Sequence, residues 1–247
     1  MVPLTFFLKV MMRPTGIVAL RALPQSKMRT ALRYVPPTTL IGAISYPLHH
    51  LSGNRAETVY DRKTVKSTAD GIRNLFEWVT IKTIGKPRLY GALLKINKTH
   101  RGELQTAVTS FPFAVMYGSG DSTITAVYLV NGEELSKGPY TMKDLERAAW
   151  GITRLGSRES VVSVENVETG KAEISEASSA ETSYAFPFKG FEVQGRGTLQ
   201  SVVDWRSGIG DYSSAKRIVM FYPEDTVKVR GELRTATVGG ETLVLAP

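Results

Sequence analysis

Helix-start signals occur at only two places in the 247-residue chain, and strand-like segments surround both of them. The first signal is the Pro-Pro-Thr-Thr run at residues 36–39, where proline suits the first helical turn and a threonine hydroxyl can cap free amides. The second is the capping-box spacing of Thr141 and Asp144. The tail of the chain has no helical stretch of useful length, so a fold dominated by strands is expected.

The predicted elements follow the order strand, helix, two strands, helix, strand. This order is typical of the ferredoxin-like α+β arrangement, which also underlies RNA-binding sheets of the recognition-motif (RRM) type. The first strand is predicted at residues 4–12 and 17–20, as one extended or bulged strand broken near Pro14 and Gly16, and the last strand is predicted at residues 161–167. Two hairpins are predicted, one joining residues 76–82 to 88–95 and the other joining residues 113–117 to 123–130.

A change in composition divides the chain near residue 170. Residues 170–184 are rich in Ser, Ala and Glu, which is typical of a linker or a mobile loop, and the tail beyond them is strand-like and punctuated by glycine. We therefore expect an α+β domain at residues 1–170, with a basic hairpin inserted at about residues 57–111. A linker and a smaller β-rich domain are expected at residues 171–247.

Charge is distributed very unevenly along the chain. The first 56 residues contain seven lysines or arginines and no carboxylate. Residues 1–102 carry 17 basic and 4 acidic side chains, a net charge of +13, whereas residues 103–247 carry 14 basic and 19 acidic ones, a net charge of −5. A one-sided field of this size attracts and steers a polyanion, so nucleic acid is the expected partner.

A basic loop leads into the first predicted helix. Helix N-termini present unpaired amides and the positive end of the helix dipole, so such a loop is suited to hold phosphates. The alternative is an ordinary capped helix of the core. The residues expected to hold phosphates are Arg21, Lys27, Arg29, Arg33, Thr38 and Thr39, and Tyr34 is a candidate for stacking on a base.

Two further segments are candidates for RNA contact. Basic side chains beside aromatic ones in the predicted insertion could grip a single strand by charge and stacking, although lysines also protect solvent-exposed sheet edges. In the turn at residues 154–158 a glycine allows close backbone approach and the arginines offer donors, although glycine is also a common helix C-cap. These candidates are Arg62, Lys63, Trp78, Lys82, Lys86, Arg154, Gly156, Ser157 and Arg158.

No catalytic constellation stands out in the sequence. It lacks cysteine, which excludes disulfides, thiolate zinc sites and cysteine nucleophiles, and it has only three histidines, so neither a metal nor a cofactor is expected. His49 and His50, near Tyr46, could in principle cleave RNA by acid–base chemistry. Adjacent residues of a helix point about 100° apart, however, so the pair cannot act together on one face.

No export or membrane-spanning segment is predicted. Lys9 interrupts the apolar start of the chain, and no small-residue cleavage site follows before Arg13. Prolines break the uncharged run at residues 34–54, which argues against a bilayer span. We therefore expect a cytoplasmic protein without membrane contact.

Two motifs resemble those of the Cas5 family, which belongs to the RAMP superfamily of CRISPR-associated proteins. The segment Arg-Tyr-Val-Pro-Pro-Thr-Thr-Leu-Ile-Gly-Ala at residues 33–43 resembles the start of the first helix in that family. The segment Leu-Gly-Ser-Arg-Glu at residues 155–159 resembles its glycine loop after the second helix. The length, the basic insertion and the strand-rich tail are similar to the archaeal type I-A branch.

The resemblance implies a ferredoxin-like RAMP domain with a thumb-like hairpin and a place in the Cascade complex of CRISPR antiviral defence. Members of the family hold the 5′ handle of the CRISPR RNA (crRNA), with Cas7-type backbone subunits and a Cas8-type large subunit as partners, which implies binding without catalysis. Two alternatives stay open. One is a metal-independent endoribonuclease that processes precursor crRNA, and the other is a protein-interaction scaffold without RNA contact.

Overall fold

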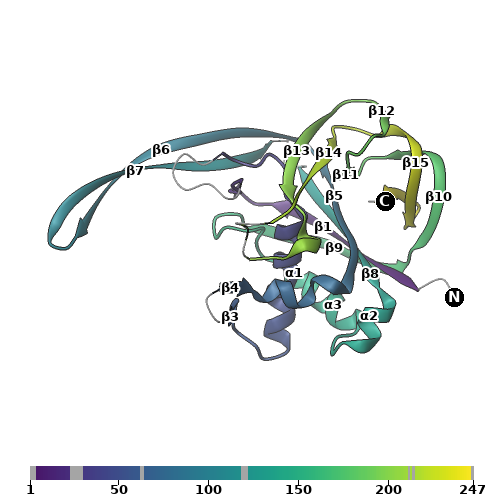
Figure 1. Cartoon of the computed structure of the whole chain (residues 1–247), viewed down its shortest axis with the longest axis horizontal. Coiled ribbons are helices and arrows are strands. Elements are labelled where there is room, and N and C mark those ends of the chain that lie inside the picture. The colour runs from purple at the N-terminus through teal and green to yellow at the C-terminus, as the bar shows by residue number, and fades with distance from the viewer. Residues whose placement is uncertain are drawn as a thin grey trace.

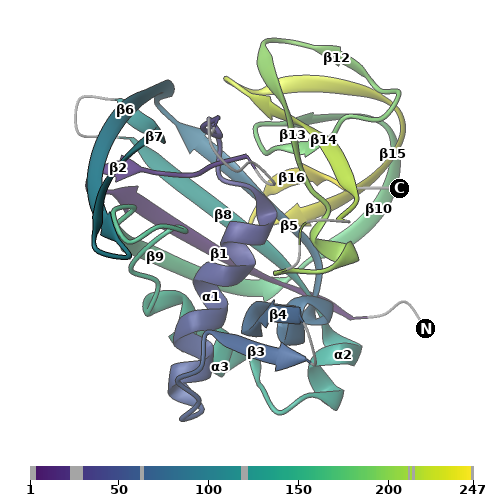
Figure 2. The same ribbon diagram turned by 60° about the vertical axis from the view of Figure 1, so that its left-hand side comes forward.

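A four-stranded antiparallel sheet forms the centre of the fold, with the strand order β5-β8-β1-β9. The structure, a computed structural model, describes residues 4–22, 30–61, 64–117, 122–210, 212 and 215–245. The strands of the sheet are β1 (Thr5–Pro14), β5 (Phe76–Ile84), β8 (Thr123–Asn131) and β9 (Val162–Lys171), and helices α1 (Pro37–Leu51) and α3 (Met142–Trp150) pack against each other beside it (Figure 1, Figure 2). These six elements follow the predicted chain order of strand, helix, two strands, helix, strand.

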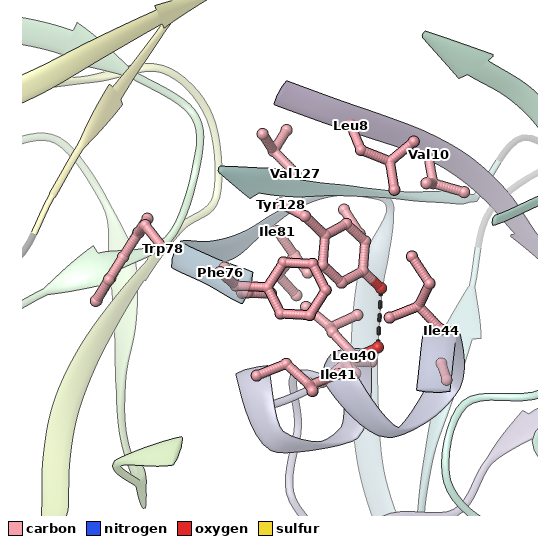
Figure 3. Packing of buried hydrophobic residues seen from close by; sticks show 14 of the residues in the cluster. Leu8, Val10, Leu40, Ile41, Ile44, Phe76, Trp78, Ile81, Val127 and Tyr128 are labelled. Atoms are coloured by element: carbon pink, nitrogen blue, oxygen red, sulfur yellow. Dashed lines mark hydrogen bonds between the residues drawn. The ribbon is translucent and has the colours of Figure 1, made fainter. Parts of the chain in front are cut away.

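The core lies between this sheet and α1. Leu8 and Val10 of β1 point toward the helix and are completely buried with Leu40 and Ile44 (Figure 3). In the same cluster the buried hydroxyl of Tyr128 donates a 2.9 Å hydrogen bond to the Leu40 carbonyl oxygen. This bond satisfies a phenol that would otherwise be costly to bury, and it fixes α1 against β8.

The other face of the sheet is covered by C-terminal residues. Side chains alternate along a strand, so Lys9 points away from α1, and its Nζ lies 2.8 Å from the carboxylate of Glu241 in β16 (Glu241–Val244). On β5, the Ile81 carbonyl accepts a 2.8 Å hydrogen bond from the Ala185 amide. Buried residues of both halves of the chain belong to one hydrophobic cluster.

The C-terminal half forms two small sheets. One contains β10 (Glu173–Thr182), β12 (Glu192–Gln194), β15 (Val227–Val238) and β16, and the other contains β11 (Phe186–Pro187), β13 (Gly197–Val203) and β14 (Arg217–Pro223). The tail is rich in strands, as predicted. The linker prediction was wrong for residues 173–182, because they form β10 and pair with β15. Most side chains of β10 are exposed, which explains its polar, linker-like composition.

A long hairpin projects as an arm from the body of the molecule (Figure 1). Strand β6 (Lys86–His100) pairs with β7 (Glu103–Tyr117) through a turn in which Arg101 and Gly102 have φ values of 52° and 81°. Positive φ at both turn residues is typical of a type I′ hairpin turn. Both hairpins predicted from the sequence were wrong. β5 pairs with β8 and not with the following strand β6, and β7 pairs with β6 and with β2 (Ile17–Val18) and not with the following strand β8.

The two helix starts differ in how they are capped. Thr141 and Asp144 form the predicted capping box of α3. The predicted threonine cap of α1 was wrong, because Pro36 is the N-cap residue, so that Thr38 and Thr39 already lie in the first turn.

The short elements β3 (Thr58–Asp61), β4 (Thr64–Ser67), η1 (Thr68–Leu75), α2 (Gly132–Lys137) and η2 (Trp205–Ser207) complete the described fold. None of the described helices combines the length and the apolar character needed to cross a bilayer.

Candidate nucleic-acid-binding groove

Two adjoining pockets lie along α1, and we call them together the α1 groove. The proximal pocket, at the N-terminal end of the helix, has a volume of about 200 Å³, and the distal pocket, further along the helix, has a volume of about 180 Å³. Thr39, Gly42 and Ser67 line both pockets. Residues 201–203 border only the proximal pocket, whereas residues 55–57 and 153–154 border only the distal one.

Gly42 forms part of the wall that the two pockets share. A Cβ atom added at this position would meet no atom within 4 Å, so packing does not require glycine. Glycine in a helix interior costs about 1 kcal/mol relative to alanine. The absent side chain leaves the helix backbone open toward the groove, which suits a ligand that approaches the helix closely.

Two arginines line the proximal pocket. Arg21 is exposed, and Arg217 at the start of β14 donates to the Ser201 side-chain oxygen at 3.0 Å. The half-buried Thr38 and Thr39 lie in the wall of the same pocket, in the first turn of α1. The structure therefore brings three of the predicted phosphate-binding residues together with Arg217, at a helix end that favours anions.

The turn after α3 packs against the first turn of α1. Gly156 has a φ of 83°, and a Cβ atom added there would lie 2.6 Å from Leu20 Cδ2 and 3.5 Å from Thr39 Cγ2. The position therefore needs glycine both for its backbone conformation and for close packing. Gly156 thereby sets the position of Arg154 and of the exposed Arg158.

A pair of serines fixes this turn to the N-terminal part of the chain. The hydroxyls of Ser157 and Ser160 lie 2.9 Å apart, and the Ser160 hydroxyl accepts a 2.8 Å hydrogen bond from the Ala19 amide. Ser160 is completely buried. Ser157, predicted as a phosphate donor, thus also has a role in holding the turn.

Arg154 and Tyr46 form one side of the distal pocket. The Arg154 guanidinium donates to the Glu57 carboxylate at 3.1 Å and lies 5.3 Å from the centre of the Tyr46 ring. The ring centre of His50 lies 4.4 Å from that of Tyr46. The pocket therefore combines an aromatic ring and a positively charged group that a carboxylate holds in place.

His49 lies in the distal pocket with both ring nitrogens engaged. Its Nε2 is 3.3 Å from the Thr68 carbonyl oxygen, and its Nδ1 is 3.4 Å from the Tyr140 hydroxyl. Nε2 can donate to the carbonyl oxygen, and Nδ1 can then accept from the Tyr140 hydroxyl. A general base needs a nitrogen that is free to take a proton, so this arrangement does not favour catalysis by His49.

The loop before α1 is held by the C-terminal half of the chain. The Arg33 amide donates to Gln200 Oε1 at 2.9 Å, and the Tyr34 ring stacks on Tyr222 with 4.5 Å between ring centres. Tyr34 is only 6% exposed, so its predicted role in stacking on a base does not fit the structure. The Arg33 side chain points toward β13, with its Nη1 3.4 Å from the Thr198 hydroxyl.

Besides Arg33 and Tyr34, three more predicted residues lie away from the groove. Trp78 is 2% exposed and points away from α1 (Figure 3), with the Arg206 guanidinium 5.6 Å from its ring, so it offers no free face to a base. Lys82 pairs with Glu241 on the far side of the sheet. Lys86 is exposed at the base of the arm. The predictions for Lys27, Arg29, Arg62 and Lys63 fall outside the described residues.

Sequence reasoning missed the contribution of the C-terminal half. Ser201 and Arg217 reach the proximal pocket because β13 pairs with β14, and Gln200 of the same strand holds the loop before α1. No motif marks these residues. Their role follows from contacts between segments more than 160 residues apart, which local sequence patterns do not encode.

No protein-family model matches the chain. Two curated proteins of Saccharolobus solfataricus are similar to it. The protein named CRISPR-associated protein Cas5 3 is 29% identical over 165 residues, and the match covers 60% of the chain but only 58% of that relative. The protein named CRISPR system aCascade subunit Cas5 1 is 27% identical over 246 residues, covering 90% of the chain and 91% of the relative. A solved CRISPR protein from Archaeoglobus fulgidus is similar in fold, with a TM-score of 0.59 and 17% identity over 97% of the chain and 98% of that protein.

Proposed function

The chain belongs to the Cas5 family of CRISPR-associated proteins, and we propose that it is a non-catalytic crRNA-binding subunit of a type I Cascade effector complex. In this proposal it holds the 5′ handle of the crRNA. One relative that matches over 91% of its own length is named as a subunit of aCascade, which supports a role in such a complex.

The fold supports this proposal through its sheet topology. We assign the central sheet and its two helices to the ferredoxin-like RAMP class, because the order β5-β8-β1-β9 with helices after β1 and β8 is the arrangement expected for it. In this assignment the β6–β7 arm is the thumb-like insertion. The cytoplasm is the expected location of such a complex.

The α1 groove is the proposed seat of the handle. The observation that carries the proposal is Gly42, a glycine in the helix interior that packing does not require. It lies in the wall that the two pockets share, and arginines line both pockets. Arg21, Arg217, Thr38 and Thr39 would hold phosphates in the proximal pocket, because guanidinium groups, hydroxyls and a helix N-terminus all favour an anion. Arg158 would extend this surface beyond the turn.

Contacts with other subunits are proposed for the arm and for the C-terminal half. The arm carries Lys86 at its base and extends well beyond the compact part of the molecule (Figure 1). We propose that it reaches along the RNA to a Cas7-type backbone subunit. The C-terminal strands would face other subunits of the complex, among them a Cas8-type large subunit.

The dependence of RNA affinity on salt tests the proposed groove. For single strands the slope of log affinity against log salt is about −0.7 per neutralised phosphate. The Arg21→Ala/Arg217→Ala variant is expected to bind handle RNA more weakly, with a slope that is shallower by about 0.7 for each phosphate that it no longer neutralises. The Lys189→Ala/Arg230→Ala variant removes the same charge from exposed positions of the C-terminal half and serves as the matched control. Equal slopes for the two variants would contradict the proposed seat.

Two outcomes would favour the alternative functions. Cleavage of repeat RNA by the pure protein in the presence of a chelator would favour the endoribonuclease, which the engaged nitrogens of His49 do not support. Failure of the native protein to bind any handle RNA, together with stable association with Cascade subunits, would favour the scaffold.

A further inference from the structure

A contiguous apolar patch lies on the small sheet formed by β11, β14 and β13 (Figure 2). Phe188, Leu199 and Val219 are 38%, 53% and 42% exposed, and we call these three side chains the β14 patch. The Phe188 amide donates to the Val219 carbonyl oxygen at 2.8 Å, so these two residues are neighbours across the strands. Leu199 lies diagonally across from Val219, because it pairs with Phe221 two residues further along β14.

Phe221 connects the three residues of the β14 patch. Its ring centre lies 6.2 Å from that of Phe188, and Leu199 is its partner on β13. Phe221 and Val219 point to the same face of the sheet, because side chains alternate along a strand. Met220, between them, points to the other face and is buried in the main core. The β14 patch is therefore one surface and not a set of scattered side chains.

The β14 patch continues a buried cluster of the C-terminal half. The members of this cluster come from both small sheets and are Phe186, Phe221, Val227, Val229, Leu233 and Val244. Phe221 is only 8% exposed, whereas the three residues of the patch are open to solvent. A contiguous apolar surface with a polar rim is typical of a contact site. A partner that covers the patch extends this cluster.

Basic residues surround the β14 patch. Within three positions of its members along the chain every charged residue is basic and exposed, and these residues are Lys189, Arg196, Lys216 and Arg217. The Glu224 carboxylate, next to Arg196, lies 4.0 Å from Lys86 Nζ. Opposite charges across an interface steer association and fix its orientation. The rim therefore suits a partner surface that carries carboxylates.

The centre of the β14 patch favours a protein over a nucleic acid. Nucleic acids are bound chiefly through donors to their phosphates and through stacking on aromatic rings. The side chains of Leu199 and Val219 offer neither. An apolar centre within a polar rim is the usual anatomy of a protein–protein interface.

From this surface we propose that an acidic protein partner docks on the β14 patch in the assembled complex. An apolar side chain of the partner packs against Phe188, Leu199 and Val219, and its carboxylates face the basic rim. This inference rests on the proposed function and adds a docking site that is separate from the α1 groove. Ser201 pairs with Val219 and also lines the proximal pocket, so the partner lies beside the proposed seat of the RNA.

Photo-crosslinking from the patch tests this inference. Leu199 of the full-length protein is replaced by p-benzoylphenylalanine, and the protein is assembled with crRNA and the recombinant Cascade subunits of the same organism. We expect a crosslink to a segment of another protein subunit that is rich in Asp and Glu. The same amino acid in place of Leu4, which is 52% exposed, should not yield that segment. A crosslink to the RNA, to a second copy of the chain or to a segment without carboxylates, or no crosslink, would overturn the proposal.

Competition for the complex measures the contribution of the patch. The Leu199→Gln/Val219→Thr variant and the native protein, with different tags, compete for limiting amounts of the other subunits. The native protein should be incorporated at least about tenfold more often, because polar replacement at the centre of an interface costs a factor of this size. The matched control is Leu4→Gln/Val65→Thr, at positions that are 52% and 47% exposed, and it should compete as the native protein does. Equal incorporation of the two variants would contradict the docking site.

Two further measurements on Leu199→Gln/Val219→Thr exclude other causes. Its thermal midpoint should equal that of the native protein, because substitutions of exposed side chains change stability little. Its affinity for handle RNA should also be unchanged, because neither residue lines the α1 groove. A loss of RNA affinity would place these residues in the seat of the RNA and overturn the docking site.

The outcomes separate the patch from the groove. If the native protein binds handle RNA with the predicted salt dependence but position 199 crosslinks to no protein, the docking site is wrong and the RNA seat stands. If the native protein neither binds handle RNA nor enters the complex, both are wrong.

Discussion

Gln200 of β13 holds the backbone of Tyr34 through both ends of its side-chain amide. Its Oε1 accepts from the Tyr34 amide at 3.1 Å, and its Nε2 donates to the Tyr34 carbonyl oxygen at 2.9 Å. The same Oε1 accepts from the Arg33 amide at 2.9 Å. One side chain of the C-terminal half thus fixes the chain just before α1, where the α1 groove begins.

Replacement of Gln200 by alanine is expected to destabilise the protein and to loosen the entry to the helix. Gln200 is buried, so its removal leaves two amides and a carbonyl oxygen without their partner, at a cost of about 1–3 kcal/mol for each buried unsatisfied group. Urea unfolding measures the loss, and Gln194→Ala, at an exposed position of β12, is the matched control. Equal stability of Gln200→Ala and Gln194→Ala would show that the loop is held by other contacts.

Glu241 is expected to make stability depend on pH in the acid range. Burial opposes the charge on its carboxylate, but hydrogen bonds from Lys82, Lys9 and Tyr184 outweigh burial and lower its pKa from 4.5 to about 2. A lowered folded-state pKa stabilises the fold above the unfolded-state value, and this contribution is lost as pH falls from about 4.5 through about 2.

Thermal midpoints of the native protein and Glu241→Gln between about pH 7 and pH 2 test this dependence. The variant should be less stable near neutral pH, and the difference should shrink as the pH falls through the window of Glu241. The exposed Glu192→Gln serves as the control and should follow the native curve. A constant difference between Glu241→Gln and the native protein at every pH would argue against the assigned role of this carboxylate.

Much of the fold could be predicted where the signal is local. Thr141 and Asp144 stand three residues apart and mark the start of α3, and the Pro-Pro pair marks the start of α1, because caps and proline act on adjacent backbone groups. Strand pairing was predicted wrongly, since pairing of neighbouring segments was assumed. The arm separates β5 from β8, and these two strands pair because both bury apolar side chains in the central sheet.

The residues of the candidate α1 groove were predictable only where they lie close together along the chain. Arg21, Thr38 and Thr39 lie in one basic segment and meet in the proximal pocket. Trp78 was misread because an aromatic residue on a strand has the same local pattern whether it faces solvent or the core, and here the C-terminal half covers it. Arg217 was missed because no local sequence pattern marks it. Only the long-range pairing of β14 with β13 brings it to the proximal pocket beside α1.

Gly42→Ala should separate stability from RNA binding. An added methyl group meets no atom within 4 Å, and alanine favours a helix by about 1 kcal/mol relative to glycine, so the variant should be more stable than the native protein. The same methyl group projects toward the groove and should weaken binding of handle RNA. Chemical denaturation and RNA titration measure the two effects on one sample.

The control for this variant is Gly71→Ala in η1, where an added Cβ also meets no atom within 4 Å. Position 71 does not line the α1 groove, so its substitution should leave RNA affinity unchanged. If Gly42→Ala binds handle RNA as tightly as Gly71→Ala does, no ligand approaches the helix at position 42.

Gly156→Ala should damage both the fold and the groove, and a second glycine allows the two causes to be separated. Gly156 and Gly190 have φ values of 83° and 72°, but an added Cβ clashes with Leu20 only at position 156. Gly190→Ala therefore measures the cost of the backbone conformation alone, about 1 kcal/mol. Gly156→Ala should cost more in urea unfolding, and it should also weaken RNA binding because the turn that carries Arg154 must move away from Leu20. If the two variants lose the same free energy of unfolding, the turn accommodates the added methyl group, and packing of Gly156 against Leu20 does not set the position of the turn.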